Sequence, residues 1–207
     1  TGPTGSGKST SLYSILKKIN QPDVHIITVE DPVEYRIEKI RQVQLNRKAG
    51  MTFASGLRSI LRQDPDVIMV GEIRDFETAT LAVQAALTGH MVFSTLHTND
   101  ASGAITRFID MGIEPFLVSS TMTVSFAQRL IRKVCPNCMS NYKPSQEALN
   151  AWGINNKVNA NFVQGKGCFN CMHTGYKGRT GVYEVMTIDD QIKDLILKRQ
   201  SSHMIHQ

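Results

Sequence analysis

The segment "GPTGSGKST", residues 2–10, decides the fold class of this chain. It matches the pattern G-x-x-x-x-G-K-[ST] and adds a further glycine, Gly5, inside the loop. Glycines let backbone N–H groups turn inward around phosphate oxygens, where side chains would obstruct them. We therefore interpret the segment as a phosphate-binding loop and expect a bound nucleotide, with a chance glycine-rich turn as the alternative.

The loop also assigns roles to single residues. In such a loop the lysine, here Lys8, reaches the β- and γ-phosphates, and the following hydroxyl, here Ser9, ligates Mg²⁺. Apolar residues at helical spacing follow, so a helix begins near Gly7 and points its positive end at the phosphates. The candidate nucleotide-binding residues are Gly2, Thr4, Gly5, Ser6, Gly7, Lys8, Ser9 and Thr10.

The composition is that of a soluble globular protein of one or two domains. The chain has 207 residues, of which 41% are hydrophobic and 20% charged, and its longest apolar runs are too short to cross a bilayer. The net charge of +5 is mildly basic, and the aromatic residues (7%) do not interleave with basic runs. We therefore expect no nucleic-acid partner.

The order of the expected elements indicates an α/β fold with a parallel sheet. Buried strands are expected from Val24, at "VIMV" and at "MVFS", with helices between them. Short extended pieces are expected at Tyr35–Ile40 and Val43–Leu45. Further on, we expect helices over Ala101–Met111 and Pro115–Arg129, a strand at "GRTGVYEVM" and a helix capped near Asp189.

Polar side chains follow each of the three buried strands. The first strand ends at Glu30, the second leads to Glu72, and the third leads to His97. Ligands of open α/β sheets lie beyond the carboxyl ends of the strands, so these side chains should face Lys8. We expect Lys8, Glu30, Glu72 and His97 to form a catalytic site. The alternatives are a strand-end cap for Glu30 and a surface position for His97.

All four cysteines fall into two C-x-x-C pairs, "CPNC" and "CFNC". This spacing is typical of zinc ribbons and knuckles, in which tight turns bring four sulfurs to one metal. Two disulfides or four free thiols are the alternatives, but disulfides are rare in cytosolic proteins. A closed four-sulfur shell leaves no open position, so we expect a structural Zn²⁺. Its ligands would be Cys135, Cys138, Cys168 and Cys171.

Four segments together resemble a known family. They are "GPTGSGKST" (Walker A), "ITVEDPVEY" (aspartate box), "RQDPDVIMVGEIRD" (Walker B) and "TGHMVFSTLHTND" (histidine box). Their order is similar to that of the ATPases that power type II secretion and type IV pilus assembly. The cysteine-bearing tail resembles the four-cysteine insertion of the assembly-type and secretion-type members.

The resemblance implies a RecA-like P-loop NTPase core with an inserted tetracysteine zinc segment. The implied division is a core at 1–132, a zinc segment at 133–176 and a final strand and helix at 177–207, with further N-terminal domains preceding this core. The implied cofactors are ATP, Mg²⁺ and Zn²⁺, and the implied assembly is a homo-hexamer. Such a motor works in the cytoplasm, peripherally at the inner membrane. It drives an inner-membrane platform protein with its associated cytoplasmic and membrane assembly components.

The resemblance also implies roles for the site residues. Glu72 matches the Walker B acid that acts on Mg²⁺ through water, while Gly71 stands where other P-loop proteins hold an aspartate. Glu30 is the candidate for orienting the attacking water, His97 resembles the γ-phosphate contact, and His90 supports it. Which glutamate is the base stays open. Arginines that neutralise the transition state are expected among Arg58, Arg62, Arg74, Arg107 and Arg129.

Two other functions remain open from sequence. One is a nucleic-acid-translocating P-loop ATPase, whose turnover DNA would stimulate. The other is a nucleotide-gated docking module without turnover, whose zinc segment binds a partner. The sequence also leaves pilus assembly and secretion equally open.

Overall fold

The computed structural model describes residues 1–154 and 161–206. The expected zinc segment is therefore described except for residues 155–160, which lie outside the described residues together with Gln207. The chain forms two compact units. Unit 1 comprises Thr1–Arg129 and Tyr183–Gln207, and unit 2 comprises Leu130–Val182.

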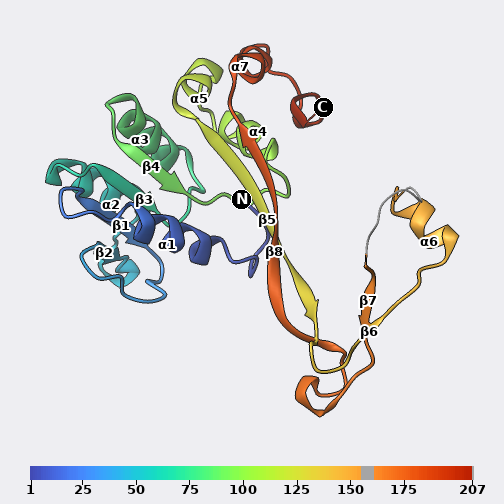
Figure 1. Cartoon of the computed structure of the whole chain (residues 1–207). Coiled ribbons are helices and arrows are strands. Elements are labelled where there is room, and N and C mark those ends of the chain that lie inside the picture. The colour runs from blue at the N-terminus through green and yellow to red at the C-terminus, as the bar shows by residue number, and fades with distance from the viewer. Residues whose placement is uncertain (155–160, 207) are drawn as a thin grey trace. The chain divides into compact units, whose positions relative to one another are not determined.

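The centre of unit 1 is a parallel sheet of four strands in the order β2-β1-β3-β4 (Figure 1). Every residue of β1 and β3 is buried, as expected for strands of a parallel sheet that is covered on both faces. Strand β3 is a continuous apolar run, whereas β1 also buries Thr28 and Glu30. The expected α/β class with a parallel sheet is confirmed. The strands are β1 (Ile26–Glu30), β2 (Arg41–Gln44), β3 (Val67–Val70) and β4 (Met91–Ser94).

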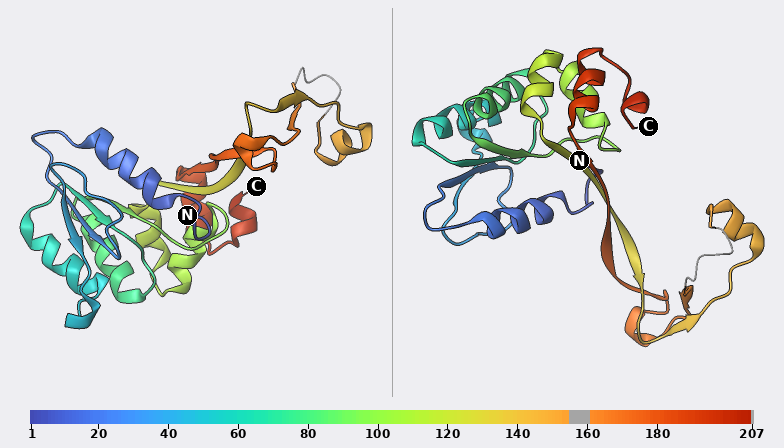
Figure 2. Two further views of the ribbon diagram at one scale, coloured as in Figure 1. Left: turned by 90° about the horizontal axis from the view of Figure 1, so that it is seen from below. Right: turned by 45° about the horizontal axis from the view of Figure 1, so that its top comes forward.

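Helices cover both faces of this sheet (Figure 2). Because side chains alternate along a strand, Ile26 and Thr28 share one face of β1 with Glu30, while Ile27 and Val29 face the other way. Helix α1 (Lys8–Ile19) packs on the first face, together with Ile26. Helices α2 (Phe53–Ile60) and α3 (Phe76–Leu87) pack on the second face, against Ile27 and Val29.

The helix expected over Pro115–Arg129 is wrong in its second half. Helix α5 ends at Thr121, and strand β5 (Val124–Val134) follows. This strand pairs with β8 (Tyr176–Thr187). Hydrogen bonds from Ile188 N to Thr123 O and from Cys135 N to Gly175 O fix the pairing as antiparallel. Local periodicity missed the strand because its partner lies about fifty residues further along the chain.

The remaining elements of unit 1 complete its core. The cap expected near Asp189 is confirmed, because its carboxylate accepts a hydrogen bond from Ile192 N at 2.9 Å. The expected extended piece at Tyr35–Ile40 forms no strand. No helix of the described chain is long and apolar enough to span a membrane. The other elements are η1 (Arg47–Ala49), η2 (Leu61–Gln63), α4 (Gly103–Asp110), α5 (Pro115–Thr121), α7 (Asp190–Leu197) and α8 (Ser202–His206).

Unit 2 has little regular structure. Its strands β6 (Met139–Asn141) and β7 (Val163–Gly165) pair antiparallel. Among the described residues of this unit, the buried hydrophobic side chains are those of Cys135 and Cys171. The centre of unit 2 is therefore its cysteine cluster. Its helices are α6 (Gln146–Ala151) and the 3-10 turn η3 (Phe169–Cys171).

Candidate nucleotide site and metal centre

The loop before α1 has the backbone geometry of a phosphate cradle. Gly2, Gly5 and Gly7 have φ values of 136°, 76° and 88°, which residues with a Cβ rarely adopt. The Lys8 ammonium donates hydrogen bonds to the carbonyl oxygens of Gly2 (2.7 Å) and Pro3 (3.0 Å). Lys8 therefore lies across its own loop, on the side where phosphate oxygens would replace those carbonyls.

The hydroxyl groups of the loop differ in exposure. Thr4, Ser9 and Thr10 are exposed, so their hydroxyl groups are open to a nucleotide and its metal ion. Ser6 is buried, and its Oγ has no hydrogen-bond partner among the described residues. The loop thus presents Ser9, the candidate Mg²⁺ ligand, at its surface.

Gln128, on β5, holds the loop from behind, and no sequence motif marks it. Its Nε2 donates to the Ser6 carbonyl at 2.8 Å, and its Oε1 accepts from the Ser11 hydroxyl at 2.7 Å. A Cβ at Gly2 would lie 2.4 Å from the Gln128 carbonyl oxygen, so this close approach requires glycine. One strand thus fixes both ends of the loop.

The ends of β3 and β4 bring Glu72 and His97 together. A Glu72 carboxylate oxygen lies 3.2 Å from His97 Nε2 and 2.7 Å from Arg74 Nε. Burial lowers the pKa of Lys8, and the charge of Glu72 opposes that shift, so the carboxylate acts on the lysine electrostatically. Among the arginines considered from sequence, Arg74 is the one paired with a site residue, whereas Arg58 pairs with Glu77.

Glu30 lies in a separate, buried network. Its side chain belongs to a residue that is 3% exposed, and its carboxylate accepts hydrogen bonds from Tyr13, Thr28 and Gln42. Within the part of the chain that the structure describes, no hydrogen bond or ion pair joins Glu30 to Lys8, Glu72 or His97. No sequence motif marks Tyr13 or Gln42 as partners of Glu30, although strand alternation places Glu30 on the face that α1 covers.

Gly71, between β3 and Glu72, has little room for a side chain. A Cβ there would lie 3.3 Å from the Val29 carbonyl oxygen and 3.4 Å from the Glu30 Cα. Both contacts are tight, because the Gly71 N–H also donates to Val29 O at 2.8 Å. An aspartate at position 71 would require a small shift of the β1 backbone, which agrees with the expectation that the acid stands one residue later, at Glu72.

His90, the suggested support for His97, contacts a helix end. Its Nδ1 lies 3.0 Å from the Ala85 carbonyl oxygen and 3.1 Å from the Thr88 hydroxyl. These contacts cap the carboxyl end of α3.

The four cysteines of unit 2 are free thiols whose sulfur atoms all lie within 4.8 Å of one another. Neighbouring Sγ atoms are 3.9 Å apart for Cys135 and Cys168, 3.8 Å for Cys138 and Cys171, and 3.7 Å for Cys168 and Cys171. A tetrahedral zinc site with Zn–S bonds of about 2.3 Å requires sulfur atoms roughly 3.8 Å apart. The cluster therefore fits Zn²⁺ and excludes disulfides in this structure.

Backbone donors favour the thiolate form of Cys171. Burial by itself raises the pKa of its thiol, but the N–H groups of Cys168 (3.2 Å) and Gly175 (3.3 Å) donate to the sulfur. Together with neighbouring thiols they lower the pKa of Cys171 to about 6. Thiolate is the form that binds metal, so the backbone is arranged for a ligand.

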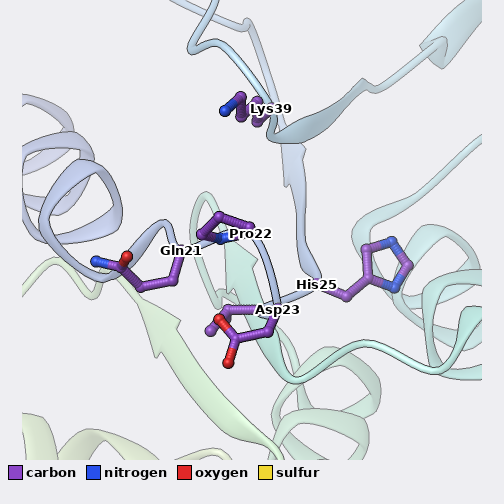
Figure 3. A pocket seen from close by; sticks show the side chains of 6 residues that line it. Gln21, Pro22, Asp23, His25 and Lys39 are labelled. Carbon is purple, nitrogen blue, oxygen red and sulfur yellow. The ribbon is translucent and has the colours of Figure 1, made fainter.

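A surface depression of about 530 Å³ lies elsewhere in unit 1, where β1 begins. Figure 3 shows Asp23, His25 and Lys39 around it. None of the residues expected to bind nucleotide lines it. Because the loop and strand ends described above lie at the carboxyl edge of the sheet, this depression is not the nucleotide site.

A family model described as "Type II/IV secretion system protein" matches residues 1–207. The chain belongs to this family. It is 56% identical to type II secretion system protein E of Aeromonas hydrophila, covering 95% of this chain and 39% of that protein. It is 52% identical to the type IV pilus assembly ATPase PilB of Thermus thermophilus, covering 98% of this chain and 23% of that protein.

Solved structures agree with the family assignment. The pilus retraction motor PilT, solved with bound ADP, matches with a TM-score of 0.67 and 34% identity over 96% of this chain and 49% of that one. The ATPase DotB of Legionella pneumophila matches with a TM-score of 0.65 and 26% identity, over 99% of this chain and 48% of that one. The chain thus spans less than half the length of these relatives.

Proposed function

We propose that this chain is the ATP-hydrolysing core of a cytoplasmic motor that powers assembly of type IV pili or of the type II secretion pseudopilus. The observation that carries the proposal is the cluster of Glu72, His97 and Arg74 at the ends of β3 and β4, whose carboxylate acts electrostatically on Lys8 of the phosphate loop. The names of the family's relatives, which include a pilus assembly ATPase and a retraction motor with bound ADP, support it.

In this proposal the chain acts mainly by positioning ATP, because phosphoryl transfer depends on positioning and electrostatic stabilisation. Lys8 and the N–H groups of the loop would hold the β- and γ-phosphates, and Ser9 would ligate Mg²⁺. When bound, Mg²⁺ would neutralise phosphate charge. Glu72 would act on the metal through a water, His97 would contact the γ-phosphate, and Glu30 would orient the attacking water.

We propose a structural role for the zinc centre in unit 2, the segment expected at 133–176. Zinc held by Cys135, Cys138, Cys168 and Cys171 would supply four bonds that tie the ends of a sparsely packed segment together. No ligand position is left for a substrate, which argues against a catalytic metal.

We further propose that the motor is a homo-hexamer and that unit 2 contacts the inner-membrane platform protein or a neighbouring subunit. Two properties of unit 2 support a contact role. Its sequence has seven basic residues and one acidic residue, Glu147. Phe169 and Met172, beside the cysteines, are 89% and 86% exposed. The motor would thereby be held peripherally at the inner membrane.

Glu72→Gln tests the proposed activity. We expect ATP turnover to fall by about 10²–10³-fold, as for loss of one preorganised electrostatic group, while ATP binding is kept. Turnover and oligomeric state are measured in the same samples, and turnover should appear only with ring assembly. Glu77→Gln is the control, because Glu77 pairs with Arg58 outside the site.

Three outcomes oppose the proposal. ATP turnover by monomers would contradict the proposal of a hexameric motor. ATP binding without turnover in the unmodified protein would favour the nucleotide-gated docking module, and stimulation by DNA would favour the nucleic-acid motor.

A further inference from the structure

The hydroxyl of Tyr13 joins the phosphate-loop helix to Glu30. Tyr13 lies on α1, in the second turn after Lys8, and is 1% exposed. Its hydroxyl is hydrogen-bonded to the Glu30 carboxylate and lies 3.2 Å from Glu34 N and 3.4 Å from Gln42 Nε2. The helix that begins at the loop therefore also contacts the end of β1.

The partners of this hydroxyl fix the direction of each hydrogen bond. The Glu34 N–H can only donate, and the Gln42 amide nitrogen can only donate. The orientation of the Gln42 amide is set by its other end, whose Oε1 accepts from Ile37 N at 2.7 Å. The single hydrogen of the Tyr13 hydroxyl must therefore point at Glu30, which accepts it.

Three donors thus converge on one buried carboxylate. Thr28 Oγ1 and Gln42 Nε2 donate to Oε1 of Glu30, and Tyr13 donates to Oε2. In the described part of the chain, no arginine, lysine or histidine forms an ion pair with Glu30. A carboxylate has about four acceptor sites on its two oxygens, and these three donors leave one site on Oε2 that can accept a hydrogen bond from a water.

We infer that Tyr13 is a positioning residue for hydrolysis: its hydroxyl sets the orientation of the Glu30 carboxylate and links that orientation to the phosphate loop. The inference rests on the proposed role of Glu30. A purely structural role is the plain alternative, because buried tyrosine hydroxyl groups normally find a partner. If Tyr13 positions Glu30, loss of its hydroxyl lowers kcat for ATP hydrolysis at unchanged KM. If its role is purely structural, kcat is not lowered specifically.

Tyr13→Phe is the direct test, because it removes one oxygen and keeps the ring, which packs edge-on against Tyr35 at a centroid distance of 4.7 Å. We expect kcat to fall on the order of tenfold, the equivalent of one hydrogen bond to a charged group, with KM for ATP little changed. The melting temperature should fall modestly, because a buried carboxylate loses one donor. Tyr35→Phe is the matched control and should leave kcat unchanged, since Tyr35 is exposed and its side chain makes no contact with Glu30 in the structure.

Thr28→Val removes another donor to Glu30 with nearly the same shape and should lower kcat similarly. A double variant of Tyr13→Phe with Glu30→Gln completes the test, because a residue that acts through Glu30 adds no further loss once Glu30 is replaced. The inference is overturned if Tyr13→Phe keeps normal kcat, if the variant mainly raises KM for ATP, or if the two losses multiply.

Failure of the proposed role of Glu30 can be distinguished from failure of the inference about Tyr13. If Glu30→Gln alone turns over ATP at the normal rate, Glu30 does not orient the water and the role assigned to it falls. If Glu30→Gln is inactive and Tyr13→Phe is normal, only the inference about Tyr13 is wrong.

Discussion

Unit 1 buries Leu57, Ile68 and Val70 completely between its sheet and helices, whereas the buried hydrophobic side chains in the described part of unit 2 are Cys135 and Cys171. In unit 1, removal of apolar surface from water supplies the stability, spread over many side chains. In unit 2 the same task falls to four sulfur atoms at one point. We therefore expect unit 1 to tolerate a single core substitution better than unit 2 tolerates the loss of a single cysteine.

Metal removal should have the largest effect and should be confined to unit 2. Structural zinc contributes about 10–16 kcal/mol of apparent binding free energy in small zinc peptides, so chelation or Cys168→Ser should unfold this unit. Amide hydrogen exchange of both units and the zinc content measure the result, with nucleotide binding by unit 1 unchanged. Met172→Ser, a change at an exposed neighbour, is the control. If the amides of unit 2 stayed protected from hydrogen exchange without zinc, its stability would not depend on the four sulfur atoms.

A core substitution in unit 1 should destabilise unit 1 and leave unit 2 unchanged. Leu57 is 0% exposed, and Leu57→Ala should lower the free energy of unfolding of unit 1 by about 2–5 kcal/mol through lost burial and a cavity. Denaturant unfolding measures it, while zinc content stays constant. Leu87→Ala, at a residue that is 51% exposed, should cost only roughly 0.5 kcal/mol. Zinc loss in Leu57→Ala would show that the units are not independent.

Gln128→Leu tests a polar contact within unit 1. The Ser6 carbonyl and the Ser11 hydroxyl would each lose a buried partner, so we expect a cost of about 1–3 kcal/mol and weaker ATP binding. Calorimetric titration with ATP measures the second effect. Gln84→Leu, on the exposed face of α3, is the matched control. Unchanged ATP affinity would mean that the loop keeps its form without Gln128.

Loss of a helix cap should have the smallest effect. Asp189→Ala removes the acceptor for Ile192 N and should cost about 1 kcal/mol. Asp190→Ala, whose side chain is 98% exposed and pairs only with Lys193, should cost much less. Thermal unfolding of the two variants side by side gives the comparison, and equal losses would contradict the assigned cap.

Much of the fold was predictable because its signals are local. Strand β3 is a continuous apolar run, β1 is mostly apolar, and the loop and the cysteine pairs are short motifs with fixed spacing. Strand β5 was not predictable in this way, since its conformation depends on pairing with β8. Tertiary pairing overrode the local pattern that favoured a helix through Arg129.

The site was predictable to a similar degree. The rule that ligands lie beyond strand ends predicted that Glu72 and His97 converge, and they lie 3.2 Å apart. The burial of Glu30 was accessible from strand alternation, but its partners Tyr13 and Gln42 come from other elements and carry no motif. Gln128 was likewise invisible, because its role depends on a strand that the sequence did not reveal.

The pairing of β5 with β8 brings the two ends of the cysteine-bearing segment together. Cys135 N donates to Gly175 O at 2.9 Å, so the chain leaves and re-enters the strand pair at neighbouring positions. Joining Val134 to Tyr176 by a two-residue hairpin turn would close the ladder without displacing either strand. Such a shortened protein would keep the phosphate loop and its partner Gln128, so nucleotide binding could be measured apart from the cysteine-bearing segment.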